Sequence, residues 1–325
     1  MTRVVVVVVN WNAGAMLREC VAALARQTFT DFAAVVVDNG SIDGSAEAVE
    51  QVGDPRFGLL RAQRNLGFAA ASNLGAARCP EAEYIALLNP DAYPEPDWLA
   101  ALVAAADAAP TAGALGCHLV DASNPALTDG TGDQYHMSGR AWRRDHGGAT
   151  ALAARRPAGP VFAPCAAAAL YRREAWQAAG GLDEDFFCYM EDVDLAFRLR
   201  LLGWECLHVP RSVCRHVGSA LTGRRSDFSV YHGQRNLVWV FVKDMPAPLF
   251  ALLLPLHLLL NAGALLLFWR RGQFAVAWRA KRDALAGLRA MWQKRRRIQA
   301  HRTMAAGGIW ARLDKRLWPP LNRTS

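Results

Sequence analysis

The sequence predicts an α/β fold, a mostly parallel central sheet with helices on both faces, followed by a helical region of different character. Three observations support this. Apolar β-branched runs alternate with helical patterns, the connections between them are short, and the charge balance changes sign near residue 240. With 325 residues, 52% of them apolar, the chain is long enough to bury one large core with a smaller unit appended.

Strand and helix signals follow one another from the N-terminus. The run RVVVVVV predicts a strand covered on both faces, and AGAMLRECVAALARQ has apolar residues at helical spacing. FAAVVVD predicts a second strand, after which DNGSIDGS supplies turn residues and a helix N-cap. FGLLRAQ, GFAAASNLGAARC and YIALLNPDAYP predict a strand, a helix and another strand. This order is typical of an open sheet with right-handed crossovers.

The cysteines and the N-terminus indicate a cytoplasmic protein. The 7 cysteines are an odd number without C-x-x-C spacing, which favours packed, reduced thiols over a disulfide framework. The apolar run near the N-terminus is too short for a signal peptide and lacks a small-residue cleavage site.

Three polar residues follow predicted strands and are expected at one edge of the sheet. In open parallel sheets ligands bind at the carboxyl ends of the strands, where Asn10, Asp38 and Asp91 lie. Asp38 is placed to hydrogen-bond a base or a ribose, or else to brace its turn. Asp91, with a second oxygen ligand nearby, suits Mg²⁺ or Mn²⁺ bridging to phosphates, although an Asn-Pro-Asp turn is the alternative.

Five segments together resemble a known family. VVVVVVNWNAG, VVVDNGSIDGS, NLGFAAASNLGAA, YIALLNPDAYP and GLDEDFFCYMEDVDLAFRLRLLGWECLHVPRSVCRHVGSA are similar, in order and spacing, to inverting family 2 glycosyltransferases, especially the rhamnosyltransferase-like branch. The resemblance covers about residues 3–240. It implies a GT-A fold, a nucleotide-diphosphate sugar donor, a divalent cation and a single displacement that inverts the anomeric carbon.

The resemblance also assigns residues to the nucleotide-sugar pocket. They are Asn10, Trp11, Asp38, Asn65, Gly67 and Asn73. Asn10 and Trp11 fall on the loop that touches the nucleotide, and Asp38 falls on the position that holds the base. A catalytic domain is expected over residues 1–240, with a nucleotide-sugar half at about 1–115 and an acceptor half at about 116–240.

The resemblance places the metal site at Asn89-Pro90-Asp91. These residues fall on the family's Asp-x-Asp, which makes Asp91 the expected ligand of Mg²⁺ or Mn²⁺. The first acid of that pattern is Asn89 here, and its amide oxygen is still able to ligate. His216 falls where the family carries a histidine near the metal or diphosphate; the alternative is an ordinary strand-end histidine.

The stretch FCYMEDVDLAFRLR places three carboxylates among apolar residues. A helix is predicted to begin near Glu191, with Asp194 and Arg198 at i, i+4, and we expect Asp194 to complement the helix dipole. In the resembling family the Glu-Asp pair lies at the acceptor end, which makes Asp192 the expected general base and Glu191 its support or an acceptor contact. Arg172 and Arg173 have two interpretations, facing solvent or a phosphate.

The last quarter of the chain differs in composition. Residues 1–240 carry 21 Lys and Arg against 26 Asp and Glu, a net charge of −5, whereas residues 241–325 carry 16 against 3, a net charge of +13. Residues 245–269 contain no charged side chain and are long enough to span a bilayer. The expected catalytic domain before this run needs cytoplasmic nucleotide sugar, and the basic residues after Trp269 also favour the cytoplasm. Pro255 and residues 261–263 are therefore expected to break the run into a re-entrant hairpin or two in-plane helices.

The following segment predicts an interfacial helix. Its apolar stripe consists of Phe274, Trp278, Leu285, Leu288 and Trp292. A basic helix with such a stripe suits an anionic membrane surface better than nucleic acid. The alternative is that the apolar run packs on the catalytic domain and the basic run is simply solvated.

Together these features predict an inverting, metal-dependent glycosyltransferase on the cytoplasmic face of the inner membrane, peripheral or re-entrant. The branch-level similarity indicates rhamnose from a deoxythymidine-diphosphate donor and a lipid-linked saccharide acceptor in cell-surface polysaccharide assembly. Alternatives are transfer of galactofuranose or N-acetylglucosamine, and a non-catalytic nucleotide-sugar-binding scaffold. No nucleic-acid partner is expected.

Overall fold

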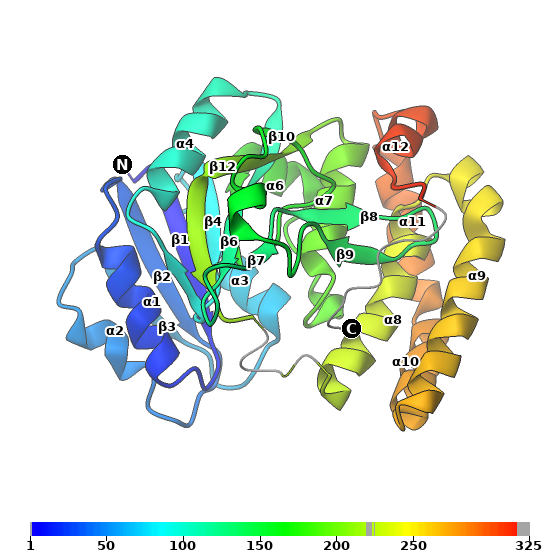
Figure 1. The fold of residues 1–325 in the computed structure, drawn as a ribbon, viewed down its shortest axis with the longest axis horizontal. Coiled ribbons are helices and arrows are strands. Elements are labelled where there is room, and N and C mark those ends of the chain that lie inside the picture. The colour runs from blue at the N-terminus through cyan, green and yellow to red at the C-terminus, as the bar shows by residue number, and fades with distance from the viewer. Residues whose placement is uncertain (1, 219–222, 224, 317–325) are drawn as a thin grey trace.

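The computed structural model describes residues 2–218, 223 and 225–316 and consists of a central sheet flanked by helices, with further helices grouped at one end (Figure 1). The first elements are β1 (Val4–Asn10), α1 (Ala15–Ala25), β2 (Phe32–Asp38), α2 (Glu47–Gln51), β3 (Phe57–Arg61), α3 (Phe68–Ala76), β4 (Tyr84–Leu88), β5 (Ala92–Pro94) and α4 (Trp98–Ala108). The predicted strand and helix order of this half is confirmed.

The rest of the chain completes the sheet and adds the helices at the end. These elements are β6 (Ala112–Asp121), β7 (Thr128–Gly130), β8 (Asp133–Tyr135), β9 (Ala141–Arg143), α5 (Thr150–Ala153), β10 (Gly159–Pro160), β11 (Ala168–Arg172), α6 (Arg173–Ala179), the 3-10 helix η1 (Glu184–Phe186), α7 (Glu191–Leu201), β12 (Glu205–His216), α8 (Asp227–Asp244), α9 (Ala247–Arg270), α10 (Phe274–Ala286), α11 (Leu288–Ala300) and α12 (Ala306–Arg312).

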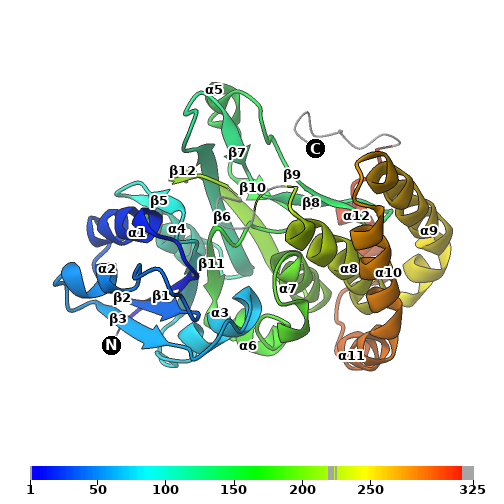
Figure 2. The ribbon, with the colours of Figure 1, turned by 90° about the horizontal axis from the view of Figure 1, so that it is seen from below.

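The sheet is parallel in its first half and mixed in its second. Its strand order is β10-β12-β6-β11-β4-β1-β2-β3, with β5 on β12 and β7 on β6. The pairs β1–β2, β1–β4 and β2–β3 are parallel, as is β6–β12, but β11 runs antiparallel to both β4 and β6. Strands β8 and β9 form a separate hairpin that extends towards the C-terminal helices (Figures 1 and 2).

The valine run of β1 is buried on both faces, as its composition predicts. Successive side chains of a strand point to opposite faces. Val5, Val7 and Val9 belong to the core shared with α3, α7 and α8, whereas Val4 and Val6 belong to the core shared with α1 and α4. Each fully buried valine contributes about 1.5–3 kcal/mol, so this strand is a central element of the fold.

Arg172 and Arg173 have structural roles. Arg172 donates to the carbonyl oxygens of Ala106 at 2.7 Å and Ala109 at 3.3 Å, at the end of α4. Arg173 donates to the carbonyl of Ala76 at 3.1 Å, at the end of α3. Cations stabilise the carboxyl ends of helices, so both guanidinium groups are accounted for by the fold.

The expected break in the apolar run is wrong, because α9 is one continuous helix of 24 residues. Pro255 lies inside this helix and lacks the backbone N–H that would donate one helical hydrogen bond. The leucine-rich turns on either side keep the helix continuous despite this loss. Asn261 does not break the helix either, since its Nδ2 donates to the carbonyl of His257 one turn earlier at 2.7 Å. This helix is long and apolar enough to cross a membrane, with a mean hydropathy of 2.1, and only 17% of its most apolar window is buried.

The expected interfacial helix is divided into α10 and α11 at Gly287. A Cβ added at Gly287 would lie 2.6 Å from the Trp239 ring, so the close approach of α8 requires glycine here. Four of the five stripe residues stay exposed across the two helices, namely Phe274, Trp278, Leu285 and Trp292.

A buried ionic cluster joins α7 to the C-terminal helices. Asp194 has no exposed surface and pairs with Arg198 at 2.6 Å and with Lys243 on α8. Lys243 also contacts Asp183 at 2.6 Å, and Lys294 on α11 contacts the same aspartate at 2.5 Å. The expectation that Asp194 serves only the helix dipole is therefore wrong: its carboxylate fastens α7 to α8.

We predict that Lys243→Met destabilises the protein by about 3 kcal/mol, because removal of one partner leaves buried carboxylates undercompensated. Urea unfolding of the full chain in mild detergent measures the change. Arg282→Met is the matched control, since Arg282 pairs with Asp283 on an exposed face and its loss should change stability by no more than about 0.5 kcal/mol. Equal effects of the two substitutions would contradict the proposed importance of the cluster.

Candidate active site

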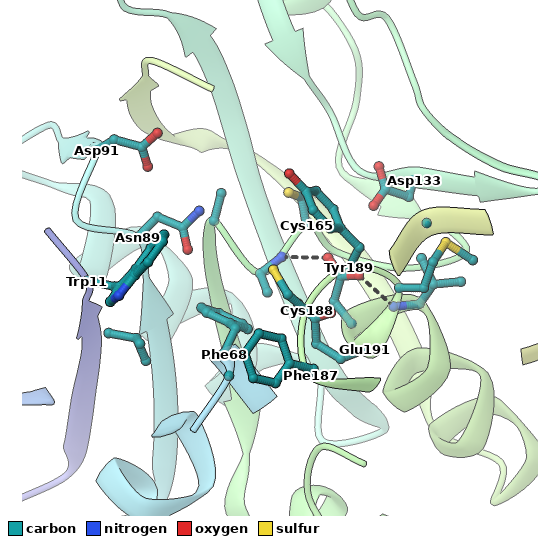
Figure 3. Close-up of a pocket in the computed structure, with 18 of the residues that line it drawn as sticks. Trp11, Phe68, Asn89, Asp91, Asp133, Cys165, Phe187, Cys188, Tyr189 and Glu191 are labelled. Atoms are coloured by element: carbon teal, nitrogen blue, oxygen red, sulfur yellow. Dashed lines mark hydrogen bonds between the residues drawn. The ribbon is translucent and has the colours of Figure 1, made fainter. Parts of the chain in front are cut away.

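A cavity of about 410 Å³ opens at the carboxyl ends of β1 and β4 and extends to the start of α7 (Figure 3). Eight of the residues predicted from the sequence line it: Trp11, Asn65, Gly67, Asn89, Asp91, Glu191, Asp192 and His216. Asn10, Asp38 and Asn73 do not line it. In Figure 3, Trp11, Asn89 and Asp91 lie on one side of the cavity and Asp133 on the other.

Asn10 and Asp38 are buried behind the cavity wall and support it. The Nδ2 of Asn10 donates to Asp38 at 3.3 Å, to Ser41 at 3.1 Å and to Ser45 at 2.8 Å. These bonds join the ends of β1 and β2 to the loop that follows β2. Asp38 also accepts from the backbone N–H of Ser41 at 3.3 Å, which fits the turn-bracing interpretation left open by the sequence.

Asn39 is a lining residue that the sequence analysis missed. Its Nδ2 donates to the Oδ1 of Asn65 at 3.0 Å, and its Oδ1 accepts from the N–H of Leu66 at 2.8 Å. It therefore holds the loop before α3 against the end of β2. The only sequence signal was its place directly after Asp38 in a turn.

Gly67 allows the start of α3 to approach the loop before α7. It has a φ of +85°, and a Cβ would lie 2.6 Å from the Phe187 ring. Phe68 donates its N–H to the carbonyl of Phe187 at 2.6 Å. Asn73, farther along α3, faces away from the cavity and bonds the backbone of Leu182. Gly67 and Asn73 thus connect the two halves of the site, one inside the cavity and one outside it.

Asp91 and His216 are brought together by the pairing of β5 with β12. The Nε2 of His216 lies 3.3 Å from Asp91 Oδ1, and its Nδ1 lies 2.8 Å from Asp129 Oδ2. Burial acts to lower the pKa of His216, but the hydrogen bonds to Asp129 and Asp91 outweigh it and raise the pKa to about 9. The imidazole is thus held between two carboxylates at the edge of the cavity.

The donor set around Asp91 fits a divalent cation. The carboxylate and the Asn89 amide oxygen are ligand types that both Mg²⁺ and Mn²⁺ accept. The His216 imidazole becomes a ligand for Mn²⁺ when a bound cation displaces its Nε2 proton. Asn89 and Asp91 both face the cavity (Figure 3).

The loop before α7 is strained and is held from α8. Phe187, Tyr189 and Met190 have φ values of +65°, +70° and +69°, which side chains other than glycine seldom adopt. The Nδ2 of the fully buried Asn236 donates to the carbonyls of Phe186, Cys188 and Tyr189 at 3.0, 2.9 and 2.8 Å. Asn236 therefore fixes the conformation that places the carboxylate pair, a role that the sequence did not signal.

Glu191 and Asp192 begin α7 and differ in their surroundings. Asp192 accepts hydrogen bonds from the backbone N–H groups of Ala166 at 3.1 Å and Val193 at 2.8 Å. Burial raises its pKa above the ordinary aspartate value. Burial and the neighbouring Asp192 raise the pKa of Glu191 to about 8, so Glu191 carries a proton at neutral pH while Asp192 is the stronger candidate for an ionised base.

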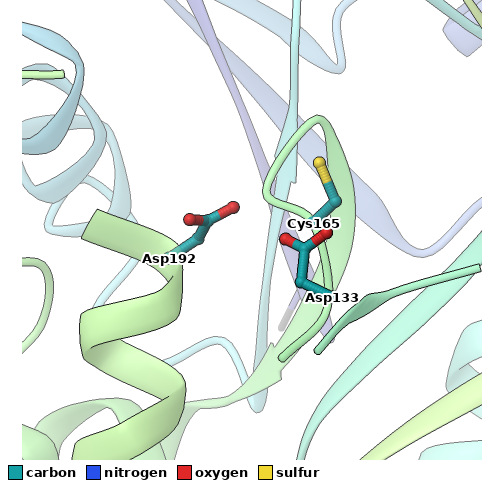
Figure 4. A group of neighbouring side chains, drawn as sticks. All are labelled: Asp133, Cys165 and Asp192. Carbon is teal, nitrogen blue, oxygen red and sulfur yellow. The ribbon is translucent and has the colours of Figure 1, made fainter. Parts of the chain in front are cut away.

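Asp133 faces Asp192 across the cavity, which the sequence did not predict. The ligand atoms of Asp133, Cys165 and Asp192 lie within 4.8 Å of one another (Figure 4). Burial raises the pKa of Asp133 to about 7, with the charges of Asp192 and Asp129 acting in the same direction. Nothing in the local sequence marks Asp133; only the β8–β9 hairpin brings it here.

Arg143 already supplies positive charge beside this group. Its NH1 lies 2.5 Å from Asp129 Oδ2, its NH2 lies 2.9 Å from Cys165 Sγ, and its Nε lies 3.9 Å from Asp133 Oδ1. A guanidinium in this position competes with a metal ion for the same carboxylates. The His216 imidazolium beside Asp91 can release its proton when a metal binds, which a guanidinium cannot, so the Asp91 end is the better cation site of the two.

The fold is the GT-A fold of glycosyltransferases, as similar solved structures confirm. The mannosyltransferase PcManGT from Pyrobaculum calidifontis, solved with GDP-Man and Mn²⁺, has a TM-score of 0.56 at 22% identity and covers 95% of this chain and 87% of its own. GalNAc-T7, solved with UDP, GalNAc and Mn²⁺, has a TM-score of 0.60 at 16% identity over 75% of this chain, which corresponds to 48% of the GalNAc-T7 chain.

The chain belongs to glycosyl transferase family 2, which residues 5–179 match. It is 31% identical over 263 residues to the N-acetylglucosaminyl-diphospho-decaprenol L-rhamnosyltransferase of Mycobacterium tuberculosis, covering 74% of this chain and 83% of the relative. It is also 30% identical over 236 residues to the O-antigen biosynthesis protein RfbC of Myxococcus xanthus, which corresponds to 65% of this chain and 17% of that protein. The rhamnosyltransferase-like branch is thereby confirmed.

We predict that turnover at saturating acceptor responds to the ionisation of two carboxyl groups, those of Asp192 and Glu191. The rate should rise with pH as Asp192 ionises, at a pKa above the ordinary aspartate value, because burial disfavours the charge. A second change is expected near pH 8, where Glu191 loses its proton beside an ionised Asp192. Rate profiles of the native protein and of Glu191→Gln measure both; the variant should lose only the upper change. An upper change that persists in Glu191→Gln would contradict the assignment.

Proposed function

We propose that this protein is an inverting, metal-dependent glycosyltransferase that moves a sugar from a nucleotide-diphosphate donor to a lipid-linked saccharide. The single observation that carries the proposal is the arrangement of the cavity. Asp91 and His216 lie at its donor edge, and Asp192 lies at its other end. One cavity thus offers a place for a diphosphate and a place for an acceptor hydroxyl.

At the donor edge, the loops after β1, β2 and β4 would bind the nucleotide sugar. Trp11, Asn65 and Gly67 line this part of the cavity, while the buried Asn10 and Asp38 support its wall. Asp91, Asn89 and His216 would hold Mg²⁺ or Mn²⁺, which when bound neutralises the diphosphate and so favours its departure. Two GT-A neighbours were solved with Mn²⁺, which agrees with this proposal for the site.

At the acceptor end, Asp192 acts as the general base. It takes the proton of the acceptor hydroxyl as the oxygen bonds to the anomeric carbon and the bond from that carbon to the diphosphate breaks. Attack from the face opposite the leaving group inverts the anomeric carbon. Phe187 and Met190 exclude water from this centre, which disfavours hydrolysis of the donor. Because Glu191 is protonated and therefore neutral, it places no second negative charge next to Asp192.

Asp133 would bind the acceptor sugar opposite the base. Its carboxylate is buried and faces the cavity, and its nearest cationic group, Arg143, is 3.9 Å away. A carboxylate in this position accepts a hydrogen bond from a second hydroxyl of the acceptor ring. Two carboxylates on opposite walls would therefore orient the hydroxyl that reacts.

We infer the identity of the substrates by analogy with the relatives. The name of the mycobacterial relative describes transfer of L-rhamnose to N-acetylglucosaminyl-diphospho-decaprenol. We infer the same classes here: rhamnose from a deoxythymidine-diphosphate donor, an acceptor on a lipid diphosphate, and a place in cell-surface polysaccharide synthesis. Galactofuranose or N-acetylglucosamine is the alternative sugar, and a non-catalytic scaffold is the alternative class.

A lipid-linked acceptor explains the C-terminal region. We infer that residues 1–240 form the catalytic domain, with nucleotide-sugar and acceptor halves at about 1–115 and 116–240. Residues 241–325 form the part that associates with an anionic membrane on its cytoplasmic face. The exposed apolar surface of α9 and the net charge of +13 in this region support that location.

We predict that one nucleotide sugar of a panel, incubated with the protein, Mg²⁺ and membrane extract, releases nucleoside diphosphate. Asp91→Ala should abolish release because the donor diphosphate loses its cation site. Asp192→Asn should lower transfer by about 10²–10⁴-fold while leaving donor binding intact, since only the base is lost. Release is followed by a coupled assay and donor binding by calorimetry. Unchanged transfer in Asp192→Asn would favour the scaffold.

We predict that above pH 7, where the Asp133 carboxyl is ionised, Asp133→Asn raises the KM for the acceptor by about 10- to 100-fold, the effect of weakening a hydrogen bond to a charged group. Donor hydrolysis without acceptor is the internal control and should stay unchanged, because Asp133 lies away from the donor edge. Initial rates at varied acceptor concentration separate KM from kcat. A fall in donor hydrolysis with an unchanged acceptor KM would instead indicate a structural role.

A further inference from the structure

A second cavity, an apolar groove of about 630 Å³, lies among the C-terminal helices. Helices α8, α9, α10 and α11 form its walls, at the end of the molecule away from β1, β2 and β3 (Figures 1 and 2). Its lining residues are Val238, Val242, Phe250, Leu254, His257, Leu258, Leu285, Leu288, Arg289, Trp292, Gln293 and Arg296. Its volume is in the range of about 300–1,000 Å³ typical of small-ligand sites.

The chemistry of the groove is that of a site for an anionic amphiphile. Aliphatic and aromatic side chains make up most of the lining, and no acidic side chain is part of it. Arg289 and Arg296 line the groove from α11, seven positions apart and therefore on one face of that helix. Both are exposed, and within the described ranges neither forms an ion pair with an acidic side chain. A hydrocarbon chain fits the apolar part and a phosphate fits the arginine pair.

The groove opens into an exposed apolar surface. Leu258 on α9, Leu285 on α10 and Trp292 on α11 line the groove and are 59%, 64% and 42% exposed. On α9 the exposed surface continues through Leu252 and Leu259. A soluble surface rarely leaves so many large apolar side chains uncovered, and a basic rim beside them is typical of helices that lie on anionic lipid.

The groove is separate from the catalytic cavity. Gly233 of α8 lines the catalytic cavity, whereas Val242 of the same helix lines the groove. These residues are nine positions apart, about two and a half turns at 3.6 residues per turn, so they lie on opposite sides of α8. A molecule in the groove is therefore held apart from the reacting sugar, which favours a structural membrane lipid over the acceptor's own chain.

We propose that this groove binds one acyl chain of an anionic phospholipid, with the lipid phosphate between Arg289 and Arg296. The proposal rests on the membrane association inferred above. A lipid bound in the groove would hold α9, α10 and α11 against the bilayer. The α8 helix, which also carries Asn236, links this lipid site to the loop before α7.

The test uses the full chain and single-chain lipids below their micelle-forming concentration. Calorimetry with palmitoyl lysophosphatidylglycerol should show one binding site, while lysophosphatidylcholine of the same chain and glycerol 3-phosphate should bind much more weakly. The double substitution Arg289→Gln with Arg296→Gln should weaken binding by about 25-fold, roughly fivefold for each basic side chain near an anionic lipid.

Two controls identify the site. The double substitution Arg282→Gln with Arg297→Gln removes the same charge from exposed positions outside the groove lining. The affinity for the lysolipid should change by no more than about twofold, because these arginines do not contact the proposed phosphate position. Leu254→Trp fills the groove and should abolish binding of the lysolipid. Equal weakening by the two arginine pairs, or unchanged binding in Leu254→Trp, would overturn the proposal.

The remaining outcomes separate the lipid site from the proposed enzyme activity. Farnesyl diphosphate is tested as a stand-in for the acceptor chain; tighter binding than the lysolipid at the same site would overturn the assignment to phospholipid. Nucleoside diphosphate release is measured on the same preparations. Lipid binding without nucleoside diphosphate release would contradict only the proposed function. Nucleoside diphosphate release without lipid binding would contradict only the proposed lipid site.

Discussion

The buried carboxylate of Asp194 determines how the Glu191–Asp192 pair is placed. It lies one turn into α7, the helix that begins with Glu191 and Asp192, and it pairs with Arg198 within the helix and with Lys243 from α8. A charge with no solvent contact is tolerated only when paired, so α7 and α8 must meet in one register. The position of Asp192, the proposed general base, therefore depends on an ion pair two residues further along the same helix.

The same contact between helices supports a strained loop. The residues before α7 adopt left-handed backbone conformations, each of which costs of order 1–3 kcal/mol unless the surroundings enforce it. Asn236 provides that enforcement through three hydrogen bonds to backbone carbonyls. Because Asn236 and Lys243 belong to the same helix, α8 both anchors α7 and shapes the loop that leads into it.

This arrangement connects the two ends of the molecule physically. Helix α8 contributes Gly233 to the catalytic cavity, pairs with α7, and forms one wall of the apolar groove near α9. The β8–β9 hairpin makes a second connection: it carries Asp133 into the cavity, and near its tip the carbonyl of Ser138 accepts a hydrogen bond from His257 of α9 at 2.8 Å. The C-terminal helices are thus packed against the part of the chain that carries Asp133 and Asp192, which agrees with the proposal of a lipid-linked acceptor.

The sequence by itself determined the parallel first half of the sheet, the sheet-edge residues Asp38 and Asp91, and the start of α7, because hydrophobic period and turn chemistry are local properties. It did not determine that α9 continues through Pro255. A proline removes one backbone hydrogen bond, and whether the helix tolerates that loss depends on the stability of the whole helix rather than on the residues next to the proline. Only the tertiary structure decided that Asp133 faces Asp192, that Asn236 supports the loop before α7 and that Asp194 is fully buried. Each of these depends on contacts between residues distant in the chain, for which neither spacing nor composition carries a signal.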